Sequence, residues 1–347
     1  MTDESSLDDL RRLLEELGSF IRDRVIEGRD RDGVAAMRPV VHDTTADVVY
    51  AVDRVGEDAI LEWFARRWPR HLPVRLVMEG VEDDELVTFP DGTPPDDVAW
   101  ICIIDPVDGT RSLMYDKRSA WALTALAPVR PGPGAVPSAR FGDIEVAVMT
   151  ELPTTKQADV DQVGAVKGCG PSGIVARRTD LRAGTTRQIA LTPSTDHGFA
   201  HGFCSFNHFF PDGKAILAAI EQRLWDDLVP IDGRPRQIFE DQYMCNGGQI
   251  YEVATGRDRL VGDLRPLVAE ALRLEGALVT HPYDVCTSLV LVEAGGVFED
   301  PWGRPVDVAL DTTSPVAWVA YANSALAERV RPALAAAIDA VIGRGSA

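Results

Sequence analysis

The stretch from Trp100 to Trp121, WICIIDPVDGTRSLMYDKRSAW, constrains the fold more than any other part of the 347-residue chain. Its first five residues are continuously apolar and rich in isoleucine, which predicts a strand buried on both faces. Asp105 follows that run, and Asp108 lies three positions further on, after a proline. Because proline cannot donate to a sheet ladder, we expect the strand to end at Ile104 and the chain to turn sharply with both acids inside the turn.

The residues after this turn suit an anion, whereas the two acids suit a cation. A Gly-Thr-Arg-Ser sequence can open a helix or a nest of backbone N–H groups, and either would attract an oxyanion. Mg²⁺ prefers carboxylate and carbonyl oxygens and commonly links one or two carboxylates to a substrate phosphate. Metal-assisted phosphoryl chemistry is therefore one hypothesis. A surface turn is the other, because Asp, Pro and Gly dominate turns for conformational reasons.

Two further acidic residues adjoin apolar runs elsewhere in the chain. Glu79 comes directly after the strand-like run Val74–Met78, so two strand ends can bring acids together. Asp284 precedes an apolar run that stops at Gly295, and we expect Asp284 to cap a buried helix there.

These three segments resemble, in the same order, signature segments of the inositol monophosphatase and fructose-1,6-bisphosphatase superfamily. DPVDGT resembles the DP(I/L/V)DGT signature, and LVMEG resembles the strand that ends in a metal-binding Glu. HPYD with the following EAGG resembles the WD and EAGG segment, with Tyr283 in place of the usual Trp. The resemblance covers about residues 45–125 and 240–305, and three ordered matches favour phosphoryl chemistry over a surface turn.

The resemblance implies a layered αβαβα sandwich that mixes α+β and α/β character. An N-terminal α+β half, residues 1–190, would carry Glu79 and the DPVDGT motif. A C-terminal α/β half, residues 191–347, would carry Asp284. The site is expected where the two halves meet.

The resemblance also implies two or three Mg²⁺ ions and their ligands. Glu79, Asp105 and the backbone carbonyl of Val107 would hold one ion. Asp105, Asp108 and Asp284 would hold another, so that Asp105 bridges the two. Asp108 and Asp284 would also border the substrate.

Carried over in the same way, catalysis would rest on a positioned water. The Thr110 hydroxyl, with Asp53 or Glu79, would orient this water for in-line attack on phosphorus. The N–H groups of Gly109 and Thr110 would hold phosphate oxygens. Asp53 is aligned here with the Asp of the family's VT-x-x-D segment, with Asp47 as a competing candidate. An ordinary helix N-cap is the alternative interpretation of Asp53.

The segment QYMCNGGQIYEVATGR resembles the family's GSAALxLxxVAxGR segment, in which small residues let a helix approach the substrate. Asn246 becomes a candidate substrate-binding residue, although the following Gly pair could equally break a helix.

Two departures from the family are visible. Gly80 replaces a second acid, for which Glu82 could substitute. The family's Glu for an inositol hydroxyl falls on Ala277, or on Glu275 if the loop shifts, so inositol phosphate is not assured as substrate.

The function implied is that of a Mg²⁺-dependent phosphomonoesterase acting on a small sugar or polyol phosphate. A sugar bisphosphatase and a 3′-phosphonucleotide phosphatase are alternatives. A catalytically silent, phosphate-binding relative would be expected to lack one of the four acids Glu79, Asp105, Asp108 and Asp284, and all are present. An EF-hand is excluded because the motif lacks alternating oxygen ligands and a terminal Glu. A homodimer is expected.

The composition of the chain limits the classes of partner that it is expected to bind. With 54 acidic and 35 basic residues the formal charge is −19, which argues against nucleic acid polymers and anionic membranes. A small phosphorylated metabolite is the expected partner. The N-terminus lacks a signal-like pattern and no run reaches membrane-spanning length, so a cytoplasmic location is expected. Five cysteines without CxxC spacing predict reduced core thiols.

Periodicity predicts several other elements. Helices are expected over Ser5–Glu27 and Lys214–Leu224, and strands over Ala120–Ala127 and Ile144–Met149. The segment CSFNHFFPD contains a Phe pair at 209–210, which is more typical of a core than of a ligand-stacking surface.

Overall fold

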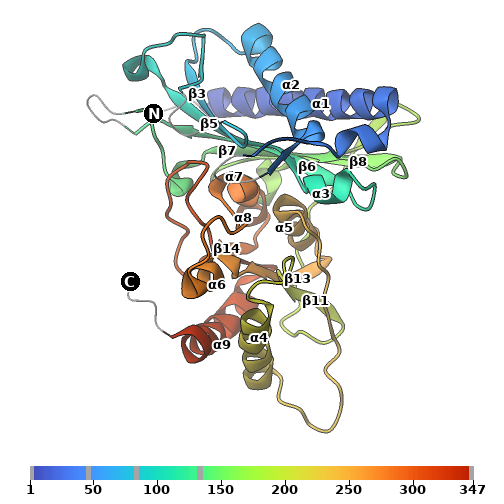
Figure 1. Ribbon diagram of the computed structural model, residues 1–347, viewed down its shortest axis with the longest axis vertical. Coiled ribbons are helices and arrows are strands. Elements are labelled where there is room, and N and C mark those ends of the chain that lie inside the picture. The colour runs from blue at the N-terminus through green and yellow to red at the C-terminus, as the bar shows by residue number, and fades with distance from the viewer. Residues whose placement is uncertain (1–3, 44–47, 82–85, 131–135, 344–347) are drawn as a thin grey trace.

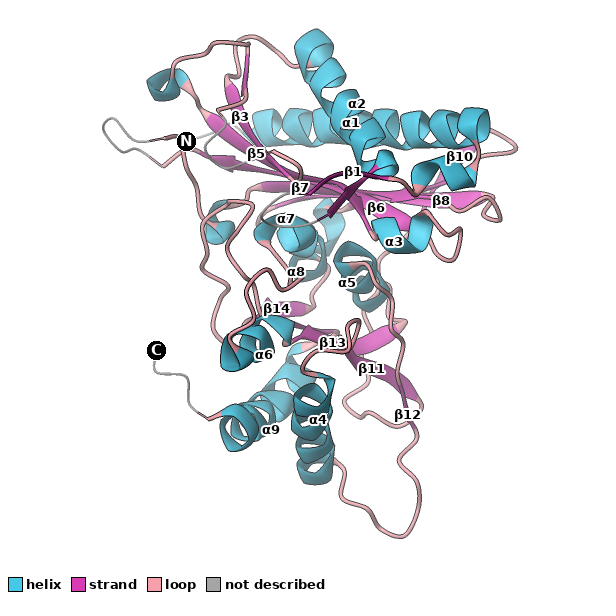
Figure 2. Ribbon diagram, in the orientation of Figure 1, coloured by secondary structure: helices cyan, strands magenta, loops and turns pink. Residues whose placement is uncertain are grey.

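The computed structural model describes residues 4–43, 48–81, 86–130 and 136–343. Its helices and sheets alternate in layers, as Figure 1 and Figure 2 show. The order is helix, sheet, helix, sheet, helix, which confirms the predicted sandwich. No helix in these ranges is both long and apolar enough to cross a membrane.

Eight strands of the described chain form the first sheet, in which β3 runs parallel to β5 and the other neighbours are antiparallel. In spatial order they are β10 (Thr185–Gln188), β9 (Val175–Asp180), β8 (Asp159–Val166), β7 (Val146–Leu152), β6 (Ala120–Pro128), β5 (Trp100–Asp108), β3 (Val74–Met78) and β4 (Thr88–Phe89). The strands predicted in this region are confirmed.

Helices α1 (Glu4–Asp32) and α2 (Ala51–Arg67) cover one face of this sheet. The predicted apolar stripe of α1 is buried against β6, β7 and β8. The helix runs five residues beyond the predicted end, because Arg29 is buried and donates to the Pro153 carbonyl at 2.6 Å. Before α2, β1 (Val40–Asp43) and β2 (Val48–Tyr50) pair antiparallel.

The second sheet contains five strands in the described part of the chain, with β11 parallel to β12 and β13. Its order is β12 (Ile238–Phe239), β11 (Gly202–Phe206), β13 (Asp258–Asp263), β15 (Trp318–Tyr321) and β14 (Val297–Glu299). Between the sheets lie α5 (Asn246–Ala254), α7 (Pro282–Val285) and α8 (Leu289–Glu293), while α4 (Lys214–Leu228) and α9 (Ser324–Ile342) pack together on the outer face. The helix predicted from Lys214 is confirmed.

Two expected elements differ from the structure. The strand that was expected to end at Ile104 continues through Asp108 as β5. The single buried helix expected after Asp284 is divided into α7, a 3₁₀ turn over Cys286–Ser288, and α8. In the second case a short 3₁₀ turn interrupts the α-helical pattern while all three of its residues stay buried.

One hydrophobic core joins the two sheets. Its buried members include Ile103 and Leu123 on the first sheet and Val261 and Val319 on the second. The first sheet ends at Gln188 and the second begins near Gly202. The division at residue 190 remains a prediction about domain organisation.

Candidate active site

The acidic residues gather where two parallel strands end at the same edge of the first sheet. Met78 of β3 pairs with Ile104 of β5, and the Glu79 N–H donates to the Ile104 carbonyl at 3.3 Å. Glu79 and Asp105 therefore leave neighbouring strands at the same level. Both line a pocket of about 60 Å³, which we call the acidic pocket. The expectation that two strand ends bring these acids together is confirmed.

A β-bulge explains how both acids of the DPVDGT motif enter that pocket. Asp105 pairs with Leu123 of β6, but Asp108 pairs with Trp121, so two residues of β5 oppose one residue of β6. Without the bulge, a spacing of three would place the two side chains on opposite faces of the strand. The extra residue restores them to the same face. Proline within the bulge costs no ladder hydrogen bond.

Asp108 is bound to the start of α5. Its carboxylate accepts hydrogen bonds from the N–H of Asn246, at 3.1 Å, and from the N–H of Gly247. The Cys245 thiol lies 3.2 Å from the Asp108 carboxylate and donates to it. The Gly pair thus forms the first turn of a helix, and the alternative that it breaks one is wrong. Asn246 lines the acidic pocket, and its Nδ2 lies 3.4 Å from Asp284 Oδ1.

Asp53 and Asp284 occupy the same kind of position in different helices. Each is the third residue of its helix and accepts the backbone N–H three residues earlier, from Tyr50 at 2.7 Å and from His281 at 2.6 Å. Asp53 is therefore not the N-cap residue, and that alternative interpretation is wrong. Asp284 does cap the start of its helix, as expected, but from the third position of a capping box. In each residue one carboxylate oxygen accepts the backbone N–H at the start of the helix. The other oxygen faces the site, where it accepts from Thr110 in the case of Asp53 and from Asn246 in the case of Asp284.

Thr110 connects Asp53 to the pocket. Its hydroxyl lies 2.7 Å from Asp53 Oδ1 and 2.7 Å from the Val107 carbonyl. The preceding Gly109 has φ of 96°, a left-handed conformation that favours glycine. A Cβ there would lie 2.9 Å from the Cβ of Cys245. The glycine therefore allows the turn into α3 (Thr110–Leu113) to pack directly against the start of α5.

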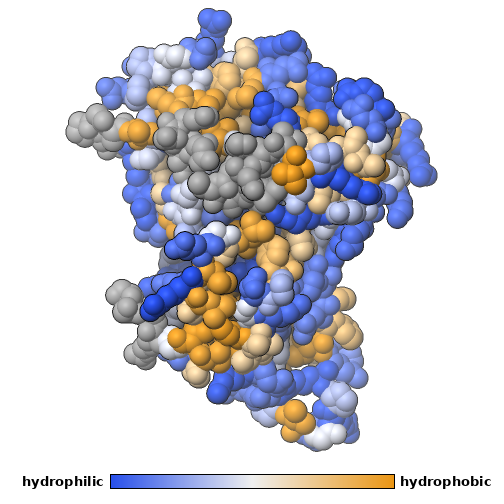
Figure 3. All heavy atoms as spheres, in the orientation of Figure 1, coloured by the Kyte–Doolittle hydropathy of each residue, from blue (hydrophilic) through white to orange (hydrophobic). Residues whose placement is uncertain are grey.

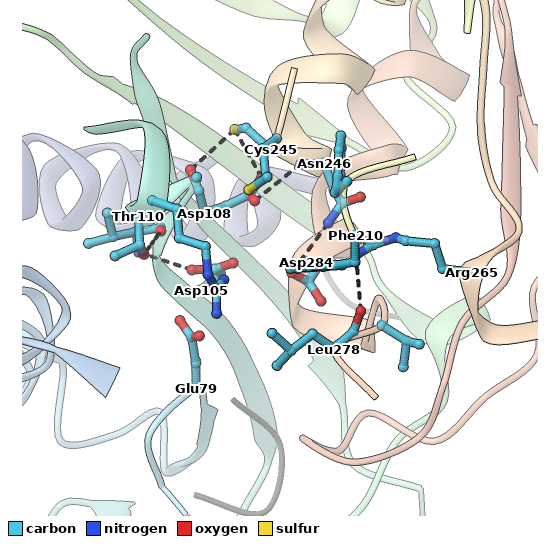
Figure 4. Close-up of a pocket in the computed structure, with 16 residues that line it drawn as sticks. Glu79, Asp105, Asp108, Thr110, Phe210, Cys245, Asn246, Arg265, Leu278 and Asp284 are labelled. Carbon is cyan, nitrogen blue, oxygen red and sulfur yellow. Dashed lines mark hydrogen bonds between the residues drawn. The ribbon is translucent and has the colours of Figure 1, made fainter. Parts of the chain in front are cut away.

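Acidic side chains outnumber basic ones in the lining of the acidic pocket. Burial raises the pKa of Asp105 well above its usual range, and the charges of Glu79, Asp108 and Asp284 raise it further. Burial also raises the pKa of Asp108 to about 6, although the hydrogen bonds from Gly247, Cys245 and Asn246 oppose that change. Figure 4 shows Glu79, Asp105 and Asp108 on one side of the pocket, with Asn246 and Arg265 facing them.

This arrangement fits a divalent cation. Among the residues that the structure describes, Asp105, Asp108 and Asp284 each offer an oxygen within 4.8 Å of the others. Mutually repelling, buried carboxylates of this kind are stabilised when a cation neutralises them. Glu79 lines the same pocket outside that group of three. Val107 also borders the pocket, and its carbonyl oxygen lies 2.7 Å from the Thr110 hydroxyl oxygen.

Several pocket residues carried no recognisable signal in the sequence. Phe209 and Phe210 are half-buried and line the acidic pocket, so their assignment to the core is wrong. Arg265 lines it too, and its guanidinium carbon lies 4.8 Å from the Phe209 ring centroid. The parallel pairing of β11 with β13 brings these residues together, because each follows the end of one of these strands. A prediction of that pairing could have identified them.

The other candidates have different positions. Asp47 and Glu82 lie outside the described residues. Gly80 has φ of 84°, and a Cβ there would lie 2.3 Å from the Glu57 carboxylate. The buried Glu57 side chain therefore occupies the space beside the missing second acid. Ala277 and Glu275 line a neighbouring cavity and not the acidic pocket.

Four of the five cysteines are buried free thiols, as predicted, whereas Cys169 is exposed. Cys169 follows a tight turn after β8, away from the apolar runs that bury the others. The expectation of a core thiol is wrong for this residue alone.

No protein-family model matches the chain, and no curated protein matches it. Solved structures do match. The extragenic suppressor protein SuhB from Bartonella henselae has a TM-score of 0.61 at 15% identity, over 94% of this chain and 98% of that one. An inositol monophosphatase from Zymomonas mobilis has 0.56 at 16%, over 95% and 98%. Fructose-1,6-bisphosphatase from Leishmania major has 0.64 at 13%, over 94% and 93%.

This chain has the inositol monophosphatase and fructose-1,6-bisphosphatase fold. The resemblance drawn from three short segments is therefore confirmed in the fold of almost the whole chain. At identities this low the likeness concerns the fold, and the roles of individual residues rest on the geometry of the acidic pocket.

Proposed function

We propose that this protein is a Mg²⁺-dependent phosphomonoesterase that hydrolyses the phosphate ester of a small sugar or polyol. The observation that carries the proposal is the convergence of Asp105, Asp108 and Asp284 within 4.8 Å, beside the Thr110 and Asp53 hydrogen bond. The fold supports it. Among the structures with this fold, Staphylococcal IMPase-II is described with bound inositol monophosphate and with 2′-AMP.

Each residue then has a defined task. Neutralisation of phosphoryl charge and activation of water are the chemistry that bound Mg²⁺ would supply. Glu79, Asp105, Asp108, Asp284 and the Val107 carbonyl would hold two or three such ions. Backbone N–H groups of Gly109 and Thr110 would hold the phosphate oxygens.

The chemical step needs no nucleophilic side chain. The Thr110 hydroxyl donates to Asp53, so its oxygen lone pairs can accept a hydrogen bond from the attacking water. Glu79 lies within the same pocket to help orient that water. The water oxygen bonds to phosphorus as the ester P–O bond breaks. One proton of that water passes to the departing alkoxide and the other stays on the phosphate, so the products are the alcohol and hydrogen phosphate. Asn246 borders the leaving alcohol.

The first experiment measures phosphate release from inositol, sugar, bisphosphate and 3′-nucleotide esters, with Mg²⁺ and with EDTA. Asp108→Asn is the test variant, and Asp159→Asn, an exposed residue of β8, is the matched control. We expect Mg²⁺-dependent turnover that Asp108→Asn lowers by about 10³-fold or more and that Asp159→Asn leaves unchanged. Mg²⁺ should also raise the melting temperature of the wild type more than that of Asp108→Asn.

Two outcomes would contradict the proposal. One is wild-type turnover by Asp108→Asn, and the other is turnover that EDTA does not affect. The homodimer and the cytoplasmic location remain predictions. Sedimentation of the purified chain tests the homodimer.

A further inference from the structure

A second cavity opens beside the acidic pocket. Its volume is about 320 Å³, against about 60 Å³ for the acidic pocket. We call it the side cavity. The two share Phe210, Arg265, Leu278 and Val279 as walls, so they adjoin each other. In Figure 4 the first three of these lie across the pocket from Glu79. The side cavity is the larger of the two, and the acidic pocket holds the acids that would bind the cations and the phosphoryl group.

The side cavity is built at the ends of two parallel strands. The segment after β11 supplies Phe210 and Asp212, and α6 (Arg265–Leu272) follows directly after β13. Residues 274–279 then close the cavity on their way to α7. Crevices at the carboxyl ends of adjacent parallel strands are common ligand sites in α/β proteins.

Most of the wall is apolar. Besides Phe210 it includes aliphatic side chains from α4, from α6 and from the segment after α6, namely Leu217, Val268, Leu274, Leu278 and Val279. Figure 3 shows hydrophobic surface gathered over α6, and Leu272 and Leu274 are each 42% exposed. The described part of the chain therefore leaves apolar surface exposed here.

The charges of the wall do not favour a second phosphate. Arg265 contacts the fully buried Asp263 through Nε at 2.9 and 3.0 Å, so its charge is already matched. Its Nη1 donates to the Leu278 carbonyl at 3.0 Å. The remaining ionic side chains, Asp212 and Glu275, are acids, which would repel an anion.

We infer that the side cavity binds an apolar, planar portion of the leaving alcohol. On this inference, which rests on the proposed function, the substrate is the phosphate monoester of a polyol or sugar that carries an aryl-like substituent, and not a bisphosphate. The ring stacks against Phe210 and the plane of the Arg265 guanidinium, whose carbon lies 5.6 Å from the Phe210 centroid.

The experiment compares two phosphate esters whose alcohols differ by a phenyl group, ethyl phosphate and 2-phenylethyl phosphate. Fructose 1,6-bisphosphate is the third substrate. Ala269→Phe and Ala277→Phe each place a ring in the side cavity without touching the acidic pocket. Ala183→Phe, at an exposed turn, is the matched control. Binding of ethylphosphonate and 2-phenylethylphosphonate, which cannot be hydrolysed, is measured by calorimetry with Mg²⁺.

We expect kcat/KM for 2-phenylethyl phosphate to exceed that for ethyl phosphate by about tenfold or more, and the bisphosphate to be the poorest substrate. Either cavity variant should remove that preference and leave ethyl phosphate turnover within about twofold, because only the side cavity is filled. Ala183→Phe should keep the preference.

The two proposals can fail separately. Equal turnover of both alkyl esters, or a preference that survives both cavity variants, overturns the inference and leaves the phosphatase standing. If no ester is hydrolysed, the binding of the two phosphonates tests the inference about the side cavity. If 2-phenylethylphosphonate binds more tightly than ethylphosphonate and Ala269→Phe removes that difference, the inference about the side cavity is supported although the phosphatase proposal has failed. Equal binding of the two phosphonates overturns the inference.

Discussion

At the scale of single residues, the Thr110 hydroxyl is shared between two acceptors. It has one proton, yet Asp53 Oδ1 and the Val107 carbonyl both lie 2.7 Å from its oxygen. Only one of them can receive that proton at a time. Asp53 is itself held by the Tyr50 N–H, so helix α2 fixes the orientation of the hydroxyl. The position of the hydroxyl oxygen beside the acidic pocket thus depends on two separate elements.

Replacing Thr110 tests this arrangement. Thr110→Val keeps the shape but removes the hydroxyl, and we expect kcat to fall by about 10²- to 10³-fold with a smaller change in KM. Thr110→Ser keeps the hydroxyl and is expected to retain activity within about tenfold. Steady-state kinetics on the best substrate of the panel measures both. A Thr110→Val enzyme with normal kcat would show that the hydroxyl does not position water.

Sequence was informative for residues whose chemistry follows from a local pattern. Glu79 and Asp105 each follow an apolar strand, so their meeting could be predicted from two runs of the chain. Arg265 and Phe210 could not be found in this way. They approach the site only because β11 and β13 pair in parallel. The first paired positions of these strands, Phe203 and Asp258, are 55 residues apart in the sequence, with α4 and α5 between them.

At the scale of elements, the contact between β5 and the start of α5 joins the two sheets at the site. The bulge in β5 directs Asp108 toward α5, and two N–H groups of the first turn of that helix bind the carboxylate. The layered order of the elements was predictable from the resemblance. The bulge and the division between α7 and α8 were not, because both are adjustments to packing between sheets that local propensity does not encode.

Gly247→Ala tests that contact. A Cβ at this position would lie 2.5 Å from Leu123 Cδ2 and 3.1 Å from Asp108 Oδ2, so either the buried Leu123 side chain or α5 must move. We expect the free energy of unfolding to fall by about 1–3 kcal/mol and phosphatase activity to fall with it. Urea denaturation measures the first. The control is Gly142→Ala, where a Cβ has nothing within 4 Å; equal stability of the two variants would contradict the close approach.

At the scale of the whole molecule, the negative charge of the chain and the burial of acidic groups both make the folded protein less stable as the pH rises. The chain carries a formal charge of −19, and self-repulsion grows as more acids lose their protons. Away from the acidic pocket, burial raises the pKa of Asp258 and of Glu221 to about 7 each. Both groups favour the protonated form in the folded state, so the folded protein retains protons that the unfolded chain has already released.

Asp258→Asn isolates this effect. Burial is the largest cause of the raised Asp258 pKa. The charges of Glu252 and Asp241 raise it further, while those of Arg118 and Arg257 lower it. Between about pH 4 and 7 the unfolded state binds fewer protons, so the free energy of unfolding falls as pH rises. At about 1.4 kcal/mol per pKa unit, this one group accounts for at most about 4 kcal/mol.

Asparagine resembles the protonated carboxyl and cannot ionise. We therefore expect Asp258→Asn to match the wild type in denaturant unfolding near pH 4 and to be more stable than it at pH 8. Glu221→Gln should behave in the same way, because its carboxyl is buried and Glu240 raises its pKa further. Asp159→Asn, which removes an exposed carboxylate, is the control, and the gain in stability between pH 4 and pH 8 should be larger for Asp258→Asn than for this variant. A stability difference for Asp258→Asn that does not grow with pH would mean that this side chain is ionised in the folded protein.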